Sequence, residues 1–213
     1  MPNWTEGMQQ TFEYYIVDPS TWKDDKKLTN IISSTINYDA EAETLGSASF
    51  DVTESVGECY IRIYLITVQN GVKEKFPLGT FLVQTPSSNF DGKVRKVTMD
   101  AYTPLLELKE NPTPIGYYIA KDENILKSAI DIIDEHSRAP IVITYDDATI
   151  PYDFVSNTND TWLSYTSDLI ANAKYKYDID GMGRILFSKN QDTASLQPVW
   201  TYEDGENSIL HPL

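Results

Sequence analysis

The sequence predicts an α+β fold in which an all-β block comes first and a smaller α/β block follows. Up to about residue 103, strand-like runs follow one another with turn residues between them. Beyond residues 103–120, apolar residues recur at helical spacing instead of at every second position. The chain has 213 residues, 41% of them apolar, which is enough to form a core in each block. We therefore expect two domains, an antiparallel β-barrel or sandwich at residues 1–110 and a small α/β domain at residues 111–213.

In the first block, strand-like runs follow one another along the chain and are separated by turn residues. The runs assigned to strands are 12–17, 30–38, 47–53, 58–69, 78–85 and 93–101. Asn70 and Gly71 follow the fourth of these runs and are the pair that best tolerates the positive φ angles of a type I′ turn. The sequence therefore predicts a tight hairpin there and a longer hairpin between the last two runs.

The alternation within the run 58–69 predicts burial on both of its faces. One face carries Cys59, Ile61, Ile63 and Leu65, and the other carries Tyr60, Arg62, Tyr64, Ile66 and Val68. The single cysteine of the chain cannot form an internal disulfide, and its apolar surroundings favour a buried thiol. We expect other elements to cover both sides of this strand.

The runs 30–38 and 47–53 each present one face of short polar side chains, which we call the polar face. Its members are Ser33, Thr35, Asn37, Ser47, Ser49 and Asp51. An ordinary solvated face of an antiparallel sheet has the same pattern. The residues by themselves leave a functional face and a plain solvated face both open.

The second block is predicted to contain two helices, a short strand and a closing hairpin. Asp122 can cap a first helix, ending near residues 136–140, whose apolar stripe is Ile125, Leu126, Ala129, Ile130 and Ile133. The segment PIVITY, residues 140–145, is interpreted as a short buried strand. Asn159 or Asp160 precedes a second helix with the stripe Trp162, Leu169, Ile170 and Ala173. Residues 175–189 then predict a strand, a glycine turn and a strand.

The charge of the chain argues against binding of nucleic acids and of anionic membranes. Its 17 basic and 32 acidic residues give a formal net charge of −15, so its surface repels phosphate groups. The N-terminus has no basic start followed by an apolar core, and no run approaches the roughly 18 apolar residues of a membrane span. We expect no membrane segment and synthesis in the cytoplasm.

The residues that could carry catalysis or hold a metal do not form a recognised pattern. His136 and His211 have no nucleophile or second metal ligand at a workable spacing. Residues 178–184, DIDGMGR, begin like a calcium loop but lack its later glutamate, and GMG lacks the third glycine of a dinucleotide loop. Asp146 and Asp147 are adjacent, so on a strand they would point to opposite faces and could not flank one sugar bond. We predict no catalytic, metal-binding or cofactor-binding residues, and a role in binding or assembly instead of catalysis.

An ordered set of segments resembles a known family. It consists of the hairpin LGTFLVQTPSSNFDGKVRKVTMDAYTPLLELKE, a helix from DENILKSAID, the succession DTWLSYTSDLIANAKYKYDIDGMGRILFSK and the closing YEDGENSIL. This set resembles the N-terminal part of phage tail-tip hub proteins, which include the baseplate hubs of contractile phages and the tail-associated lysins of long non-contractile tails. The resemblance implies a first domain of tail-tube type with a flanking helix at TPLLELKE, followed by a small α/β domain.

The resemblance also implies a role and partners. The chain would be a structural virion protein of the tail tip, in a homotrimer that joins the tail tube to the tip and through which DNA passes without specific binding. Its other partners would be a distal tail or tube protein and the tape-measure protein, with assembly in the host cytoplasm. Family members continue into a second tube-like domain, whereas this chain ends at Leu213, which leaves its own closure into a trimer open.

The family resemblance suggests a function for the polar face. Tube proteins act by pairing extended sheets around a channel, so the polar face would line that channel, where short hydrated side chains let DNA slide. The alternatives are a carbohydrate-binding β module, suggested by 14 tyrosines and 4 tryptophans, and a small hydrolase. Most of these aromatic residues lie in strand or helix stripes, where burial is the simpler explanation.

Overall fold

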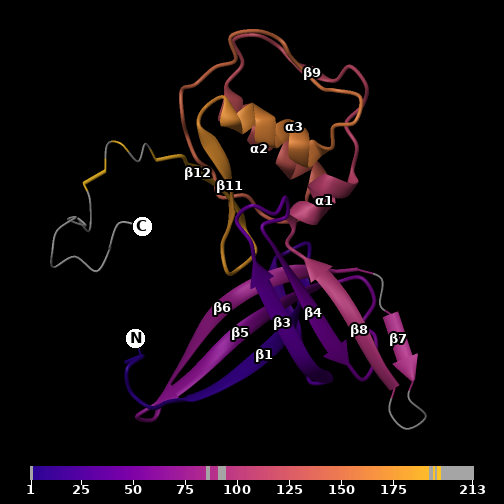
Figure 1. Ribbon diagram of the computed structural model, residues 1–213, viewed down its shortest axis with the longest axis vertical. Helices are drawn as coiled ribbons and strands as arrows, with labels where there is room; N and C mark the ends of the chain where they lie inside the picture. Colours follow the sequence, from indigo (N-terminus) through magenta and orange to yellow (C-terminus); the bar gives the residue numbers. More distant parts are fainter. Residues whose placement is uncertain (1, 85–86, 91–94, 192–193, 195, 198–213) are drawn as a thin grey trace, which may run out of the picture.

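The protein consists of an antiparallel sheet, built from residues 9–102, and a helical lobe, built from residues 105–189 (Figure 1). The computed structural model describes residues 2–84, 87–90, 95–191, 194 and 196–197. The strands of the sheet are β1 (Gln9–Asp18), β2 (Lys23–Leu28), β3 (Ile31–Tyr38), β4 (Gly46–Val52), β5 (Tyr60–Gln69), β6 (Val72–Val83), β7 (Ser87–Phe90) and β8 (Arg95–Tyr102). The lobe contains α1 (Leu105–Glu110), β9 (Tyr118–Ile119), α2 (Ile125–His136), β10 (Phe154–Val155), α3 (Trp162–Ala171), β11 (Tyr175–Ile179) and β12 (Ile185–Lys189). The α+β class predicted from the sequence is confirmed.

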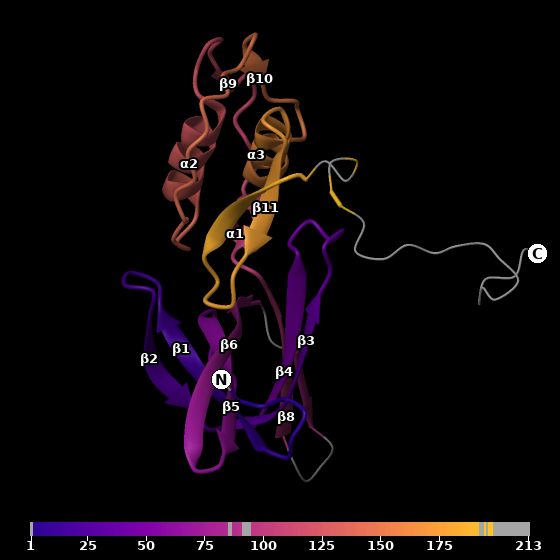
Figure 2. The ribbon, with the colours of Figure 1, turned by 90° about the vertical axis from the view of Figure 1, so that its left-hand side faces the viewer.

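The large sheet folds over on itself instead of closing into a barrel. Its order is β2-β1-β5-β6-β8-β4-β3, with β7 paired to β8. Strands β1, β5 and β6 form one layer and β3, β4 and β8 form the other (Figure 2). The two layers are joined where Leu82 and Val83 of β6 pair with β8, and beyond this short contact they diverge. Within the described residues the edge strands β2 and β3 are not paired with each other. Of the two forms predicted, a barrel and a sandwich, the sheet therefore adopts the sandwich.

The core of the sheet lies between its two layers. It is built from the inward-facing residues of both, including Phe50, Val52, Ile61, Ile63, Phe81 and Met99. Strand β5 is also covered on its other face, where Tyr60 and Arg62 are each 1% exposed. The prediction that both faces of this strand are buried is therefore confirmed.

The tight hairpin predicted at Asn70 and Gly71 is confirmed. These residues connect β5 to β6 with φ angles of 51° and 78°. Both angles lie in the left-handed region that a type I′ turn requires, which asparagine and glycine adopt at low cost. The longer predicted hairpin is formed only in part, because β6 pairs with β8 at Leu82 and Val83 alone and the intervening β7 pairs with β8 instead. Residues 85–86 and 91–94 of that connection are outside the described residues.

Strand β2 is the strand of the sheet's N-terminal half that the sequence did not predict. Its sequence, KDDKKL, has no apolar alternation, and only Leu28 is buried. β2 occupies an edge of the sheet, where charged side chains remain in water and discourage pairing with another sheet.

Both predicted helices are present; the cap of the first differs from the predicted one, and the second begins just after Asp160, as predicted. Helix α2 is capped by Asn124, whose Oδ1 accepts a hydrogen bond from the Lys127 amide at 2.9 Å, and not by Asp122. Helix α3 is capped by Thr161, which forms a reciprocal capping box with Ser164. None of the described helices is long and apolar enough to cross a membrane.

The predicted buried strand at residues 140–145 is wrong. Only Ile141 forms a bridge, to Ile185 of β12, and the following residues have no ladder partner in the described part of the chain. Ile143 and Tyr145 are 57% and 88% exposed. The apolar run predicted burial, but the chain passes along the surface of the lobe.

The helical lobe has a core of its own, to which α1 contributes. Leu105 and Leu108 are buried among residues of α2 and α3, whereas Leu106 packs with Tyr60 and Val17 of the sheet. Helix α1 therefore contacts both parts of the molecule instead of flanking the sheet alone. The assignment of residues 1–110 and 111–213 to separate domains stays a prediction.

Candidate functional surface

The register of β3 and β4 brings the polar face together. Ser33 pairs with Asp51, Thr35 with Ser49, and Asn37 with Ser47, so the six side chains form three cross-strand pairs. The β3 members are exposed and the β4 members are half-buried. The alternate residues of β4, Ala48, Phe50 and Val52, are buried in the core, which holds the polar face on the outside of its layer.

Strand β8 extends the polar face. Thr98 lies opposite Asp51 and Asp100 lies opposite Ser49. The Asp51 carboxylate accepts hydrogen bonds from Ser33 Oγ at 2.6 Å and from Thr98 Oγ1 at 2.8 Å. A hollow of about 250 Å³, lined in part by Thr35, Asn37, Ser47, Ser49 and Asp100, lies on the same face. The result is a hydrated surface of hydroxyl, amide and carboxylate groups across three adjacent strands.

The outer face of the other layer holds a buried arginine, Arg62 of β5, that the motif search did not single out. Arg62 Nε donates to Thr80 Oγ1 at 2.8 Å, and its Nη1 donates to Asp24 Oδ1 at 2.9 Å. Its Nη2 donates to the main-chain oxygen of Met182 at 3.0 Å, and Trp22 Nε1 donates to the same oxygen at 2.8 Å. The tip of the β11–β12 hairpin is thereby fixed to the sheet.

The glycines of the DGMG turn allow this close approach. A Cβ atom on Gly181 would lie 2.4 Å from the main-chain oxygen of Pro77, and one on Gly183 would lie 2.5 Å from Cβ of Thr80. Gly183 also has a φ of 74°, which disfavours any residue with a side chain. The Asp180 carboxylate accepts hydrogen bonds from the Met182 and Arg184 amides, both at 2.9 Å, and so stabilises the turn itself. The turn joins the lobe to the sheet.

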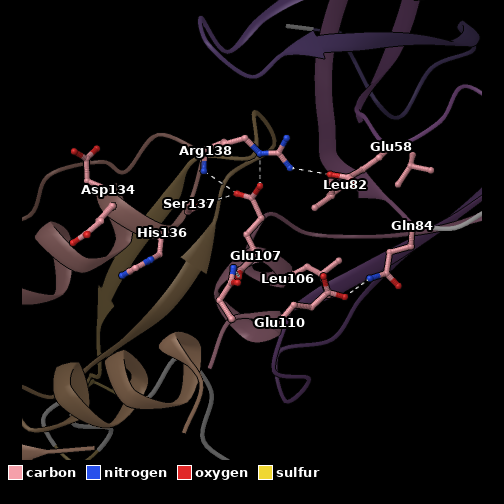
Figure 3. Close-up of a pocket in the computed structure, with 13 residues that line it drawn as sticks. Glu58, Leu82, Gln84, Leu106, Glu107, Glu110, Asp134, His136, Ser137 and Arg138 are labelled. Atoms are coloured by element: carbon pink, nitrogen blue, oxygen red, sulfur yellow. Dashed lines mark hydrogen bonds and ion pairs between the residues drawn. The ribbon is translucent and has the colours of Figure 1, made fainter. Parts of the chain in front are cut away.

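A pocket of about 900 Å³ lies between the end of β6, α1 and the C-terminal end of α2 (Figure 3). Arg138 binds Glu107 through Nε at 2.5 Å and Glu58 through Nη2 at 3.3 Å. The Ser137 hydroxyl donates to the Glu107 carboxylate at 3.1 Å, and the His136 ring stacks on Trp162 with 4.2 Å between ring centroids. The ion pairs of Arg138 link the lobe to Glu58 beside β5, whereas the His136–Trp162 stack lies within the lobe.

The remaining residues considered for chemistry are placed as follows. Asp146 accepts hydrogen bonds from Tyr175 Oη at 3.0 Å and Lys189 Nζ at 3.2 Å, and the hydrogen bond from the Ala148 amide is the main cause of its lowered pKa. Asp147 is exposed. Residues 2–84, 95–191 and the few described after them contain no group of three or more His, Cys, Asp or Glu able to hold a metal ion. His211 and the closing YEDGENSIL lie outside the described residues.

Comparison with known proteins identifies the fold. No family model and no curated protein matches the sequence. Among solved structures, a tail protein from Neisseria meningitidis has a TM-score of 0.64 with 11% identity, over 92% of this chain and 57% of that one. The 43 kDa tail protein of prophage MuSo2 from Shewanella oneidensis has a TM-score of 0.55 with 11% identity, over 85% of this chain and 53% of that one. The chain has the fold of phage tail proteins.

The tail-protein fold is matched over slightly more than half the length of these two structures. The match extends over most of the present chain, and so includes both the sheet that carries the polar face and the lobe fixed to it through Arg62. The sequence predicted the polar face from its alternation. The sequence contained no pattern that indicated the role of Arg62, because a single basic residue in an apolar strand does not identify its hydrogen-bond partners.

Proposed function

We propose that this chain is a structural protein of a phage tail tip, in the baseplate hub, where it joins the tail tube to the tip. Its sheet forms part of the wall of the DNA channel, and the polar face lines that channel. The observation that carries this proposal is the set of three cross-strand pairs between β3 and β4, on a fold shared with tail proteins. The role is structural and requires no catalytic group.

The chemistry of the polar face suits a DNA conduit. Its hydroxyl and amide groups stay hydrated, its side chains are short, and Asp51 and Asp100 add negative charge. The formal net charge of the whole chain is −15. Phosphate groups passing such a wall are repelled, so DNA moves along it without binding.

The edges of the sheet support assembly with neighbouring subunits. Strand β3 has one side without a partner strand in the described residues, and such an edge can pair with another chain, whereas the charged edge strand β2 disfavours pairing. We assign the chain to a homotrimer in the assembled tip, in contact with a distal tail or tube protein and with the tape-measure protein. Its location is the virion, after assembly in the host cytoplasm.

A triple substitution of the polar face tests the channel assignment. Ser33→Lys, Ser47→Lys and Ser49→Lys should each change the free energy of unfolding by about 0.5 kcal/mol or less, because these side chains are not in the core. Particles assembled with this variant should release their DNA poorly, because lysines in the channel bind phosphate. The measurement is the amount of DNA ejected from purified particles after triggering.

The matched control places three lysines on the other layer of the sheet, at the exposed positions Gln10, Thr11 and Val72. Particles with this control variant should eject DNA normally. Normal ejection by particles that contain the folded Ser33, Ser47 and Ser49 variant would refute the channel assignment.

A further inference from the structure

Residues 141–150 form an extended segment that is held at both ends and unpaired in the middle. At one end Ile141 forms a parallel bridge with Ile185 of β12, and at the other Thr149 forms an antiparallel bridge with Asn124. From Ile143 to Thr149 the side chains are alternately exposed and half-buried, which is the period of a strand lying on a surface. The segment therefore has strand character without a ladder.

The hydrogen bonds at the two ends define which edge of this segment is occupied. Val142 N donates to the Ile185 oxygen at 2.8 Å, and the Ala148 oxygen accepts from Ile125 N at 3.0 Å. In an extended chain the N–H and C=O of one residue point to the same edge, and those of its neighbour point to the other edge. Even-numbered residues of the segment therefore direct their backbone groups to the lobe, and Ile143 and Tyr145 direct theirs outward.

The outward edge has neither backbone partners nor covered side chains. The N–H and C=O groups of Ile143 and Tyr145 have no hydrogen-bond partner among the described residues. Their side chains are 57% and 88% exposed, on the same face of the segment. Because both ends are anchored, little conformational entropy would be lost when another strand pairs with this edge.

We propose that residues 143–147 are a docking edge for an extended, basic segment of another protein, which adds to the lobe as a β-strand. Backbone groups at Ile143 and Tyr145 would pair with the backbone of the incoming strand, and its alternate apolar side chains would cover theirs. The charge selects the partner: Asp147 is exposed beside this edge, and the lobe, residues 105–189, contains 8 basic and 14 acidic residues, a net charge of −6. A second copy of the chain would bring two acidic lobes together, so the partner is a different chain. This inference is independent of the proposed channel.

The test uses the full chain and a nine-residue peptide of alternating lysine and valine with blocked ends. Binding should slow amide hydrogen exchange at Ile143 and Tyr145, whose N–H groups face outward, and leave Thr144 unchanged. The same peptide methylated at every backbone nitrogen keeps its charge and side chains but has no backbone donors. It should bind at least about tenfold more weakly.

A pair of charge-neutral variants locates the site. Ile143→Ser with Tyr145→Ser should weaken peptide binding at least about tenfold. Tyr118→Ser with Val155→Ser, which removes two side chains of similar exposure elsewhere on the lobe, should leave binding unchanged. Circular dichroism of both variants checks that they fold.

Four results would overturn the proposal: no binding at millimolar peptide, equal binding of the methylated peptide, unchanged exchange at Ile143 and Tyr145, or equal loss of binding in the two double variants. Self-association of the chain that disappears in the Ile143 and Tyr145 variant would instead make a second copy the occupant, and would contradict the assignment to a basic partner.

Discussion

Arg62 and Met182 are 120 residues apart in the chain, and Arg62 Nη2 donates a hydrogen bond to the Met182 main-chain oxygen at 3.0 Å. The Arg62 side chain is 1% exposed, and its guanidinium also donates hydrogen bonds to Thr80 and Asp24. A buried cation is tolerated only when its donors are satisfied, and here both the sheet and the lobe supply the acceptors. Arg62 is therefore a principal link between the two parts of the molecule.

Replacement of Arg62 by alanine should lower the free energy of unfolding by about 3–5 kcal/mol, because the buried partners would lose their donor. Urea unfolding measures this change. Arg184→Ala is the matched control, because Arg184 is half-exposed and, among the described residues, forms an ion pair only with Asp180 four residues away. It should cost about 0.5 kcal/mol or less. Similar losses in the two variants would show that Arg62 does not link the parts.

Gly183→Ala should destabilise the protein more than Gly116→Ala. Both glycines have a φ of 74–78°, so each alanine incurs the cost of the left-handed conformation, about 1–2 kcal/mol. The new Cβ at residue 116 meets nothing within 4 Å, whereas that at residue 183 meets Thr80 Cβ at 2.5 Å. The difference in unfolding free energy should be about 1–3 kcal/mol. Equal thermal and urea stabilities of the two variants would contradict the close packing of the turn.

The ion pair between Glu13 and Lys27 should contribute stability that is lost in acid. The hydrogen bond from Lys27 Nζ, at 2.8 Å, is the main cause that lowers the pKa of Glu13 from 4.5 to about 2, and Tyr15 Oη also donates to this carboxylate. A folded-state pKa below the unfolded one means that the contribution is complete above pH 4.5 and is lost as the pH falls through about 2.

Urea unfolding of the wild type and of Glu13→Gln across this pH window checks the contribution of Glu13. The stability difference between the two proteins should be largest above pH 4.5 and should shrink toward pH 2. A difference that is constant over the whole window would show that the Glu13 carboxylate is not involved.

The thiol of Cys59 should react slowly in the native protein. Cys59 is half-buried and not fully buried as the sequence predicted. This partial burial raises its pKa from 9.0 to about 11, so the reactive thiolate at pH 8 is about a hundredfold scarcer than for an unperturbed thiol. Labelling with iodoacetamide should therefore be at least about a hundredfold slower in buffer than in denaturing urea. Comparable rates would mean that the residue is accessible and ionised.

Local patterns in the sequence predicted the strands and turns whose environment is decided by neighbouring residues. Strand β5 follows from its two-sided alternation, and the β5–β6 turn follows from the tolerance of Asn70 and Gly71 for positive φ. The polar face follows from alternation in β3 and β4, although only their observed register shows that its members form pairs. Strand β2 has no such alternation, because only one side chain of this edge strand, Leu28, is buried.

The amino-acid sequence by itself determined the α+β class, the order of most elements and the faces of β3, β4 and β5, because burial imposes a period on neighbouring side chains. Only the tertiary structure decided that the DGMG turn docks on Arg62 and that residues 140–145 run unpaired along the lobe. Both depend on contacts between segments far apart in the chain. An apolar run shows that a strand can form, but the backbone it pairs with is set by how the remote segments pack.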